Sequence, residues 1–243
     1  MTCALCKEEK PLQNSHIISE FLFDLLYDDK HRFNLLTVRP GDRDRIEQKG
    51  LRERLLCSCC EQHIGRFERY GSQVLNGGAP GVSGEADGSI VQVRGIDYKM
   101  FKLFLLSLVW RAGVASGRFF EKVRLGPHRE RIRLMILGED PGPFDLYPCI
   151  LFGMSLPTGA LPGIMIQPCR AKTWGHTTYH LVLPGLKLVY FISSHRIGTL
   201  ESQFVLQEDG SLVFQIRSAS ELPTLQSFME SFIAQGRRPR IDA

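Results

Sequence analysis

Apolar and polar positions recur at helical spacing in four segments of the first 140 residues. Residues 12–18 predict a short extended segment, and Ser19 with the apolar positions that follow it predicts a capped amphipathic helix reaching about residue 28. The same spacing predicts helices over residues 61–70, 96–117 and 119–138. Between these elements, residues 30–50 are polar and predict a loop.

The pattern becomes strand-like from about residue 144. Short apolar runs, LYPCILFGM, GIMIQPCRA, YHLVLPG and LKLVYFIS, are separated by Pro and Gly. Residues 202–218 predict a hairpin with Asp209-Gly210 at its turn, and residues 221–235 predict a closing helix before a basic tail. The sequence therefore predicts the α+β class, with two helices and an antiparallel sheet in the larger, C-terminal part.

A stretch rich in Gly and small polar residues, 71–90, predicts a linker or loop and marks the expected domain boundary. We expect an N-terminal module over residues 1–70 and a domain of unknown role over residues 91–243. No apolar run reaches the roughly 18 residues typical of a membrane-spanning helix. The N-terminus also lacks the apolar core of a signal peptide. A cytoplasmic protein without a membrane partner is the expectation.

Two pairs of cysteines change the picture of the N-terminal module. Cys3-x-x-Cys6 and Cys57-x-x-Cys60 each place two thiolates at the spacing of a zinc knuckle, and two knuckles complete a tetrahedral site. The order of a knuckle hairpin followed by a second knuckle at a helix start predicts a zinc treble-clef module. Cys59 could replace Cys57 or Cys60 as a ligand, and a redox role for the pairs is the alternative.

The two remaining cysteines, Cys149 and Cys169, lie in apolar contexts and are expected to be inert core residues.

The basic side chains are concentrated in one segment. The net charge is +4, but residues 94–133 hold ten basic and three acidic side chains. Such an excess can bind a polyanion, and the alternative is a solvated helix face. The candidate nucleic-acid-binding residues are Arg94, Lys99, Lys102, Arg118, Lys122 and Arg124. Arg111, inside an apolar helix, could instead serve a buried structural pair.

Asn14-Ser15-His16-Ile17-Ile18 follows the first knuckle, and the second opens as Cys57-Ser-Cys-Cys60-Glu61-Gln62-His63. Here the sequence resembles the four-cysteine HNH (His-Me finger, ββα-metal) endonucleases over residues 1–70. In that family a C-x-x-C hairpin precedes an Asp-His-Ile-x-Pro strand, and a C-x-x-C-His segment opens the final helix. The resemblance implies structural Zn²⁺ held by the four cysteines, a catalytic Mg²⁺ or other divalent cation, and His16 as general base.

Three positions depart from the family pattern. Ser15 stands where the family has the metal-binding Asp, Glu61 stands where it has a metal-binding His, and Ser19 stands where it has Pro. A carboxylate is a good ligand for a hard cation, so Glu61 is the expected substitute. His16 could alternatively be a packed strand histidine.

Ser15, His63 and Glu68 are further candidates for the catalytic metal. Glu68 is seven residues from Glu61 and shares its helix face, whereas His63 points elsewhere. The alternatives are a surface histidine for His63 and a carboxylate paired with a nearby arginine for Glu68.

Two functions remain in competition. The first is a metal-dependent endonuclease that hydrolyses nucleic acid, with DNA as the expected substrate. By analogy with free-standing nucleases of this type, it would act in prokaryotic antiphage defence. The second is a non-catalytic zinc module that recognises DNA or protein. In either case the C-terminal domain could bind a protein partner.

Overall fold

The N-terminal part of the protein is built from two strands and one helix. The strands β1 (Leu12–His16) and β4 (Arg52–Cys57) pair antiparallel, with His16 opposite Arg52. Helix α1 (Ser58–Leu75) starts directly after β4. Before β1, a bridge between Thr2 and Glu9 closes a hairpin around Cys3 and Cys6. The computed structural model describes residues 1–35, 45–155, 165–198 and 202–218, with residues 221, 226 and 230.

Short elements fill the connection between β1 and β4. A 3-10 helix, η1 (Glu20–Leu26), follows β1, and an antiparallel pair comprises β2 (Phe33–Leu35) and β3 (Arg45–Glu47). The expected helix near residue 20 is therefore a 3-10 helix, and the Ser19 hydroxyl does not cap it. It donates to the Glu68 carboxylate at 2.5 Å instead. Residues 36–44, within the predicted loop, lie outside the described residues.

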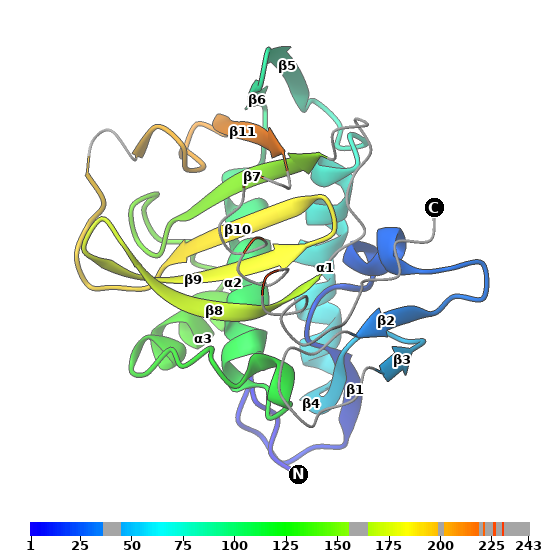
Figure 1. The fold of residues 1–243 in the computed structure, drawn as a ribbon. Coiled ribbons are helices and arrows are strands. Elements are labelled where there is room, and N and C mark those ends of the chain that lie inside the picture. Colours follow the sequence, from blue (N-terminus) through cyan, green and yellow to red (C-terminus); the bar gives the residue numbers. More distant parts are fainter. Residues whose placement is uncertain are drawn as a thin grey trace.

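The second half of the protein is a seven-stranded mixed sheet in the order β5-β6-β11-β7-β10-β9-β8. Figure 1 shows helices α1, α2 and α3 behind one face of this sheet. The helices are α2 (Tyr98–Val114), the 3-10 turn η2 (Arg118–Phe120) and α3 (His128–Gly138). The strands are β5 (Ser83–Asp87), β6 (Ile90–Arg94), β7 (Cys149–Ser155), β8 (Ile166–Thr173), β9 (His176–Leu183), β10 (Leu186–Phe191) and β11 (Leu212–Ser218).

Helix α2 forms the centre of the core. Twelve consecutive residues, 101–112, are buried, as expected of a helix that is apolar on every side. Helix α1 packs so closely against α2 that a side chain at Gly71 would meet the Phe104 ring at 2.5 Å. One continuous cluster of buried apolar side chains runs from Cys3 in the N-terminal part to Leu212 in β11.

The structure confirms the α+β class and corrects several of its details. The sheet is mixed rather than antiparallel, because β11 runs parallel to β7. The hairpin expected over residues 202–218 is wrong: β11 pairs with β6 and β7, and only a tight turn remains at Asp209-Gly210. Residues 221–235 lie almost wholly outside the described part.

Two other expected segments have different bounds. Helix α3 begins only at His128, because Gly126 adopts a left-handed φ of 56° and Pro127, with no N–H, fits only at a helix start. The segment expected to be a linker or loop, 71–90, contains the end of α1 and all of β5. The division into domains at this point stays a prediction.

A buried arginine joins the N-terminal part to the core. The Arg111 guanidinium, on α2, lies 2.7 Å from the Glu68 carboxylate of α1. It also donates to the His16 carbonyl at 2.8 Å and to the Ser19 hydroxyl at 3.2 Å. Only 2% of its side chain is exposed, so these partners replace the water that the charge has lost. The sequence-based alternative of a buried structural pair for Arg111 is confirmed.

Replacing Arg111 with Met should lower the free energy of unfolding by about 3–5 kcal/mol, because it leaves the Glu68 charge and the His16 carbonyl without their partner. Urea unfolding followed by circular dichroism measures the change. The matched control is Arg131→Met on the exposed side of α3, for which the change should stay within about 0.5 kcal/mol. Equal losses in both variants would contradict the structural role of Arg111.

Candidate metal centre and the His16 cluster

Four thiols converge where the knuckle hairpin meets the start of α1. The sulfur atoms of Cys3, Cys6, Cys57 and Cys60 all lie within 4.8 Å of one another, and those of Cys6 and Cys57 are 3.9 Å apart. Four sulfurs at about 2.3 Å from a tetrahedral Zn²⁺ would be separated by about 3.8 Å. The donor set and its spacing are thus consistent with a structural zinc site.

The backbone around the thiols favours a thiolate at one of them. Burial of the Cys3 thiol acts to raise its pKa, but backbone N–H groups from Cys57, Cys6 and Leu5 outweigh burial and lower this pKa to about 7. The Cys57 N–H lies 3.3 Å from the Cys3 sulfur. Burial raises the pKa of the Cys6 and Cys60 thiols. Preformed N–H donors around one sulfur are the outer contacts that a metal-bound thiolate needs.

The three other cysteines lie outside this cluster. Cys59 is exposed and does not belong to the group, so Cys57 and Cys60 supply the second pair. Cys149 is buried in β7 and Cys169 is partly buried in β8. Burial raises the pKa of both of these thiols. Cys149 is a core residue, as expected, whereas the same expectation is wrong for Cys169, which is only partly buried and lines an open hollow at the surface.

His16 ends β1 at the point where the chain turns into η1. Its side chain is 23% exposed, and its Nε2 atom contacts the Glu20 carboxylate. Burial lowers the pKa of His16; Glu20 opposes this shift, and Arg52 adds to it. The imidazole is therefore held toward its neutral form. Gly50, with a left-handed φ of 66°, lies against the ring, where a side chain would come within 3.3 Å of Cδ2.

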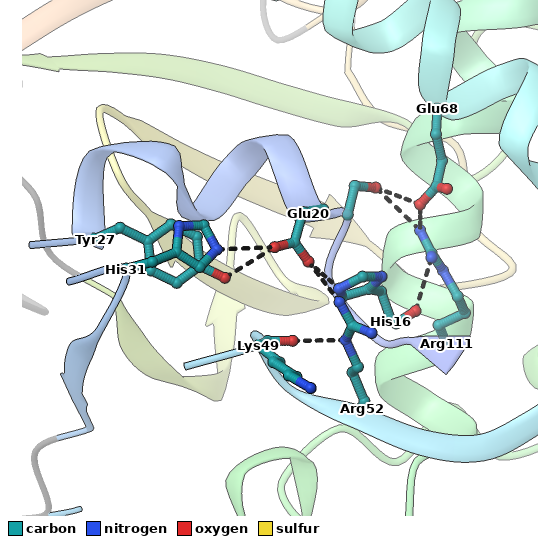
Figure 2. A network of polar contacts seen from close by, with 9 residues as sticks. His16, Glu20, Tyr27, His31, Lys49, Arg52, Glu68 and Arg111 are labelled. Atoms are coloured by element: carbon teal, nitrogen blue, oxygen red, sulfur yellow. Dashed lines mark hydrogen bonds and ion pairs between the residues drawn. The ribbon is translucent and has the colours of Figure 1, made fainter. Parts of the chain in front are cut away.

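Glu20 is the centre of the polar network around His16 (Figure 2). It accepts hydrogen bonds from Arg52 Nη2 at 3.1 Å and from the Tyr27 hydroxyl at 3.0 Å. The His31 ring stacks on Tyr27, with ring centroids 3.7 Å apart. Burial acts to raise the pKa of Glu20, but His16, Tyr27 and Arg52 together lower it. Glu20 is thus an anion beside His16.

Glu61, in the first turn of α1, faces inward beside Ser15. Burial raises the pKa of Glu61, and a hydrogen bond from Ser15 and the charge of Arg111 oppose the rise. Its Oε1 atom is buried without a hydrogen-bond partner in the described part of the chain. The Ser15 hydroxyl oxygen accepts the Leu56 N–H at 3.0 Å. A buried carboxylate oxygen without a partner is costly unless another group, such as a cation, satisfies it.

The two remaining candidates for the catalytic metal are engaged elsewhere. Glu68 is bound by Arg111 and Ser19, which matches the alternative of an arginine partner. His63 faces α3, where its Nε2 lies 2.7 Å from the Ile136 carbonyl and its Nδ1 lies 3.8 Å from Glu139. The structure therefore brings Ser15 and Glu61 together and separates His63 from them.

The six candidate nucleic-acid-binding residues do not form one surface. Lys102 is buried and donates to the carbonyls of Pro143 and Phe144, and burial lowers its pKa to about 8. Lys99 pairs with Glu139 at 3.0 Å. These two lysines are therefore unsuited to phosphate contacts. Arg94 ends β6, whereas the last three candidates lie together between α2 and α3: Arg118, Lys122 and Arg124.

Sequence reasoning missed the role of Glu20 and Arg52. Arg52 meets His16 only through the β1–β4 register. Glu20 reaches it only because the chain bends at residues 17 and 18. Glu20 is four residues after His16, but that spacing predicts a contact only within a helix, and His16 lies on a strand. In the described part of the chain, no helix is long and apolar enough to cross a bilayer.

Replacing Cys57 with Ser should abolish stoichiometric zinc binding and unfold the N-terminal part, because metal binding and folding are coupled in such sites. The matched control is Cys59→Ser, two residues away but exposed and outside the cluster. Metal analysis and circular dichroism of the purified variants measure both effects. Zinc loss in both variants, or in neither, would contradict this ligand set.

Comparison with known proteins does not assign the chain to a family. No family model matches the sequence, and neither a curated protein nor a solved structure matches it.

Proposed function

We propose that this protein is a metal-dependent endonuclease that hydrolyses phosphodiester bonds of DNA. The observation that carries the proposal is a half-buried strand histidine, His16, which burial holds toward its neutral form beside the Glu20 carboxylate. It lies in a unit of two strands and a helix that starts at the four-thiol cluster. This arrangement of two strands and a helix agrees with the resemblance of residues 1–70 to the HNH endonucleases. A role in antiphage defence follows only by analogy and belongs to the proposal.

His16 is suited to act as the general base. Hydrolysis requires a water deprotonated near neutral pH, which demands a neutral imidazole. Burial lowers the pKa of His16 and so favours that form. The Glu20 carboxylate contacts the Nε2 atom of the ring. An anion at this position would stabilise the imidazolium that forms when the ring accepts the proton of the water.

Glu61 is the residue that would hold the catalytic cation. A hard cation such as Mg²⁺ is commonly bound through one or two carboxylates, with waters and substrate phosphates completing its shell. The Oε1 atom of Glu61, which has no hydrogen-bond partner among the described residues, would supply one such oxygen. When bound, the cation would neutralise charge at the scissile phosphate and the leaving oxygen. Glu68 is excluded from this role because Arg111 holds it.

The second candidate function is a non-catalytic zinc module that recognises DNA or protein. The observation that favours it lies at Ser15. This residue replaces the metal-binding Asp of the HNH pattern, and its hydroxyl oxygen already accepts the Leu56 N–H. A module of this kind would bind its partner with no divalent-cation-dependent cleavage.

Replacing His16 with Ala should reduce plasmid cleavage about 10²- to 10⁴-fold, because it removes the general base. The matched control is His63→Ala, which removes a histidine that faces α3 and should leave cleavage near the wild-type rate. Supercoiled plasmid with Mg²⁺, Mn²⁺ or Ni²⁺ is the substrate. An absence of cleavage by the wild type with every cation would favour the non-catalytic alternative.

Two substitutions beside His16 should move its pKa in opposite directions. Glu20→Gln removes an anion that raises the pKa, so the pKa should fall further; Arg52→Met removes a cation that lowers it, so the pKa should rise. The charges of Glu68 and Arg111 also act on the ring and are unchanged in both variants.

Titration of the His16 ring protons by NMR measures both shifts without depending on activity. If His16 is the base, the acid limb of the cleavage profile should move to lower pH in Glu20→Gln and to higher pH in Arg52→Met. Shifts of the same sign in the two variants would contradict the network described here.

A further inference from the structure

A set of basic side chains from two distant segments gathers at one edge of the sheet. Lys122 and Arg124 follow η2, whereas Arg170 and Lys172 lie on β8, the edge strand of the sheet. All four are exposed. We call these four residues the β8 basic surface. Arg118, in η2, adjoins it, because its carbonyl accepts the Gln167 amide at 3.0 Å.

Lys122, Arg124 and Arg170 line one open hollow, together with Glu121 and Cys169. The hydroxyl of Tyr179, which is opposite Arg170 in the β8–β9 register, donates to the Arg124 carbonyl and so fixes the two segments together. Lys172 is two residues along β8 and therefore on the same face as Arg170.

The four basic side chains of this surface form no ion pair among the described residues, although the Glu121 side chain lines the same hollow. Charges on an edge strand also discourage pairing with another sheet, which explains Arg170 and Lys172. It does not explain why Lys122 and Arg124 are brought to the same hollow, where like charges repel one another.

The β8 basic surface is tied to the strands that carry the candidate site. Glu53 of β4 lies opposite Ser15 and next to Arg52. Its carboxylate accepts hydrogen bonds from the N–H groups of Ser116 at 2.8 Å and Gly117 at 2.7 Å. The segment that leads to Lys122 is therefore anchored one position along β4 from the partner of His16.

We propose that the β8 basic surface binds the phosphate backbone of duplex DNA and holds it for the site at His16. Clustered lysines and arginines bind a polyanion by releasing its counterions. Among the residues that the structure describes, no aromatic side chain lines the hollow, and binding of single strands depends on stacking of bases on aromatic rings. The surface is therefore suited to a duplex backbone. This inference rests on the proposed function for its choice of DNA, and the binding itself can be tested separately.

The experiment measures binding of a fluorescent DNA duplex as a function of salt, by anisotropy, without added divalent cation. The test variant is Lys122→Gln/Arg170→Gln. The matched control, Arg129→Gln/Arg131→Gln, removes the same charge from exposed positions on α3. Each lost phosphate contact lowers the slope of log affinity against log salt by about 0.9. We therefore expect the slope of the test variant to fall by roughly 1.8 and that of the control to stay unchanged.

Equal slopes in the two variants would overturn the inference, as would tighter binding of an RNA duplex or of a single strand than of the DNA duplex. The outcome is independent of catalysis. Surface-dependent binding without cleavage would leave the inference standing and remove the proposed nuclease function. If the wild type cleaves DNA but the test variant binds it as the control does, the proposed nuclease function stands and this inference is overturned. Circular dichroism spectra of both variants verify that each is folded.

Discussion

The convergence of four thiols is the constraint on which the N-terminal part depends. The first pair lies in a ten-residue hairpin and the second pair at the junction of β4 and α1. A short hairpin and a lone two-stranded pair bury too little apolar surface to be stable by themselves. One ion bound by all four sulfurs would hold the hairpin, β4 and the first turn of α1 in one geometry. Glu61 directly follows the last of these cysteines, so its direction is set by the same constraint.

The second constraint is the buried charge of Arg111. A guanidinium inside an apolar helix is stable only where every donor finds a partner. Its partners here are the Glu68 carboxylate, the Ser19 hydroxyl and the His16 carbonyl. These partners come from three elements: Glu68 from helix α1, Ser19 from the turn after β1, and His16 from the end of β1. The core helix α2 thereby fixes the backbone of His16, which lies more than 90 residues earlier in the chain.

Sequence reasoning succeeded where a local pattern carries the signal. Each C-x-x-C pair is recognised within four residues, and the need of one metal ion for four thiolates joined the two pairs across about 50 residues. Apolar periodicity predicted α1 and α2. It failed where partners are distant. The parallel pairing of β11 with β7 joins segments about 60 residues apart, and Lys102 is buried by carbonyls about 40 residues later. The contact of Glu20 with His16 was missed for a different reason: the two residues are only four positions apart, but their contact depends on the backbone bend at residues 17 and 18.

The departures from the HNH pattern at Ser15 and Glu61 are best understood together. The family pattern places an anionic ligand on the strand and a neutral imidazole on the helix. This chain places a neutral hydroxyl at Ser15 and a carboxylate at Glu61. A carboxylate is a better ligand for a hard cation than an imidazole, whereas burial raises the pKa of Glu61 and so opposes its anionic form. The cation that the proposed function requires would offset this effect of burial by favouring the anion.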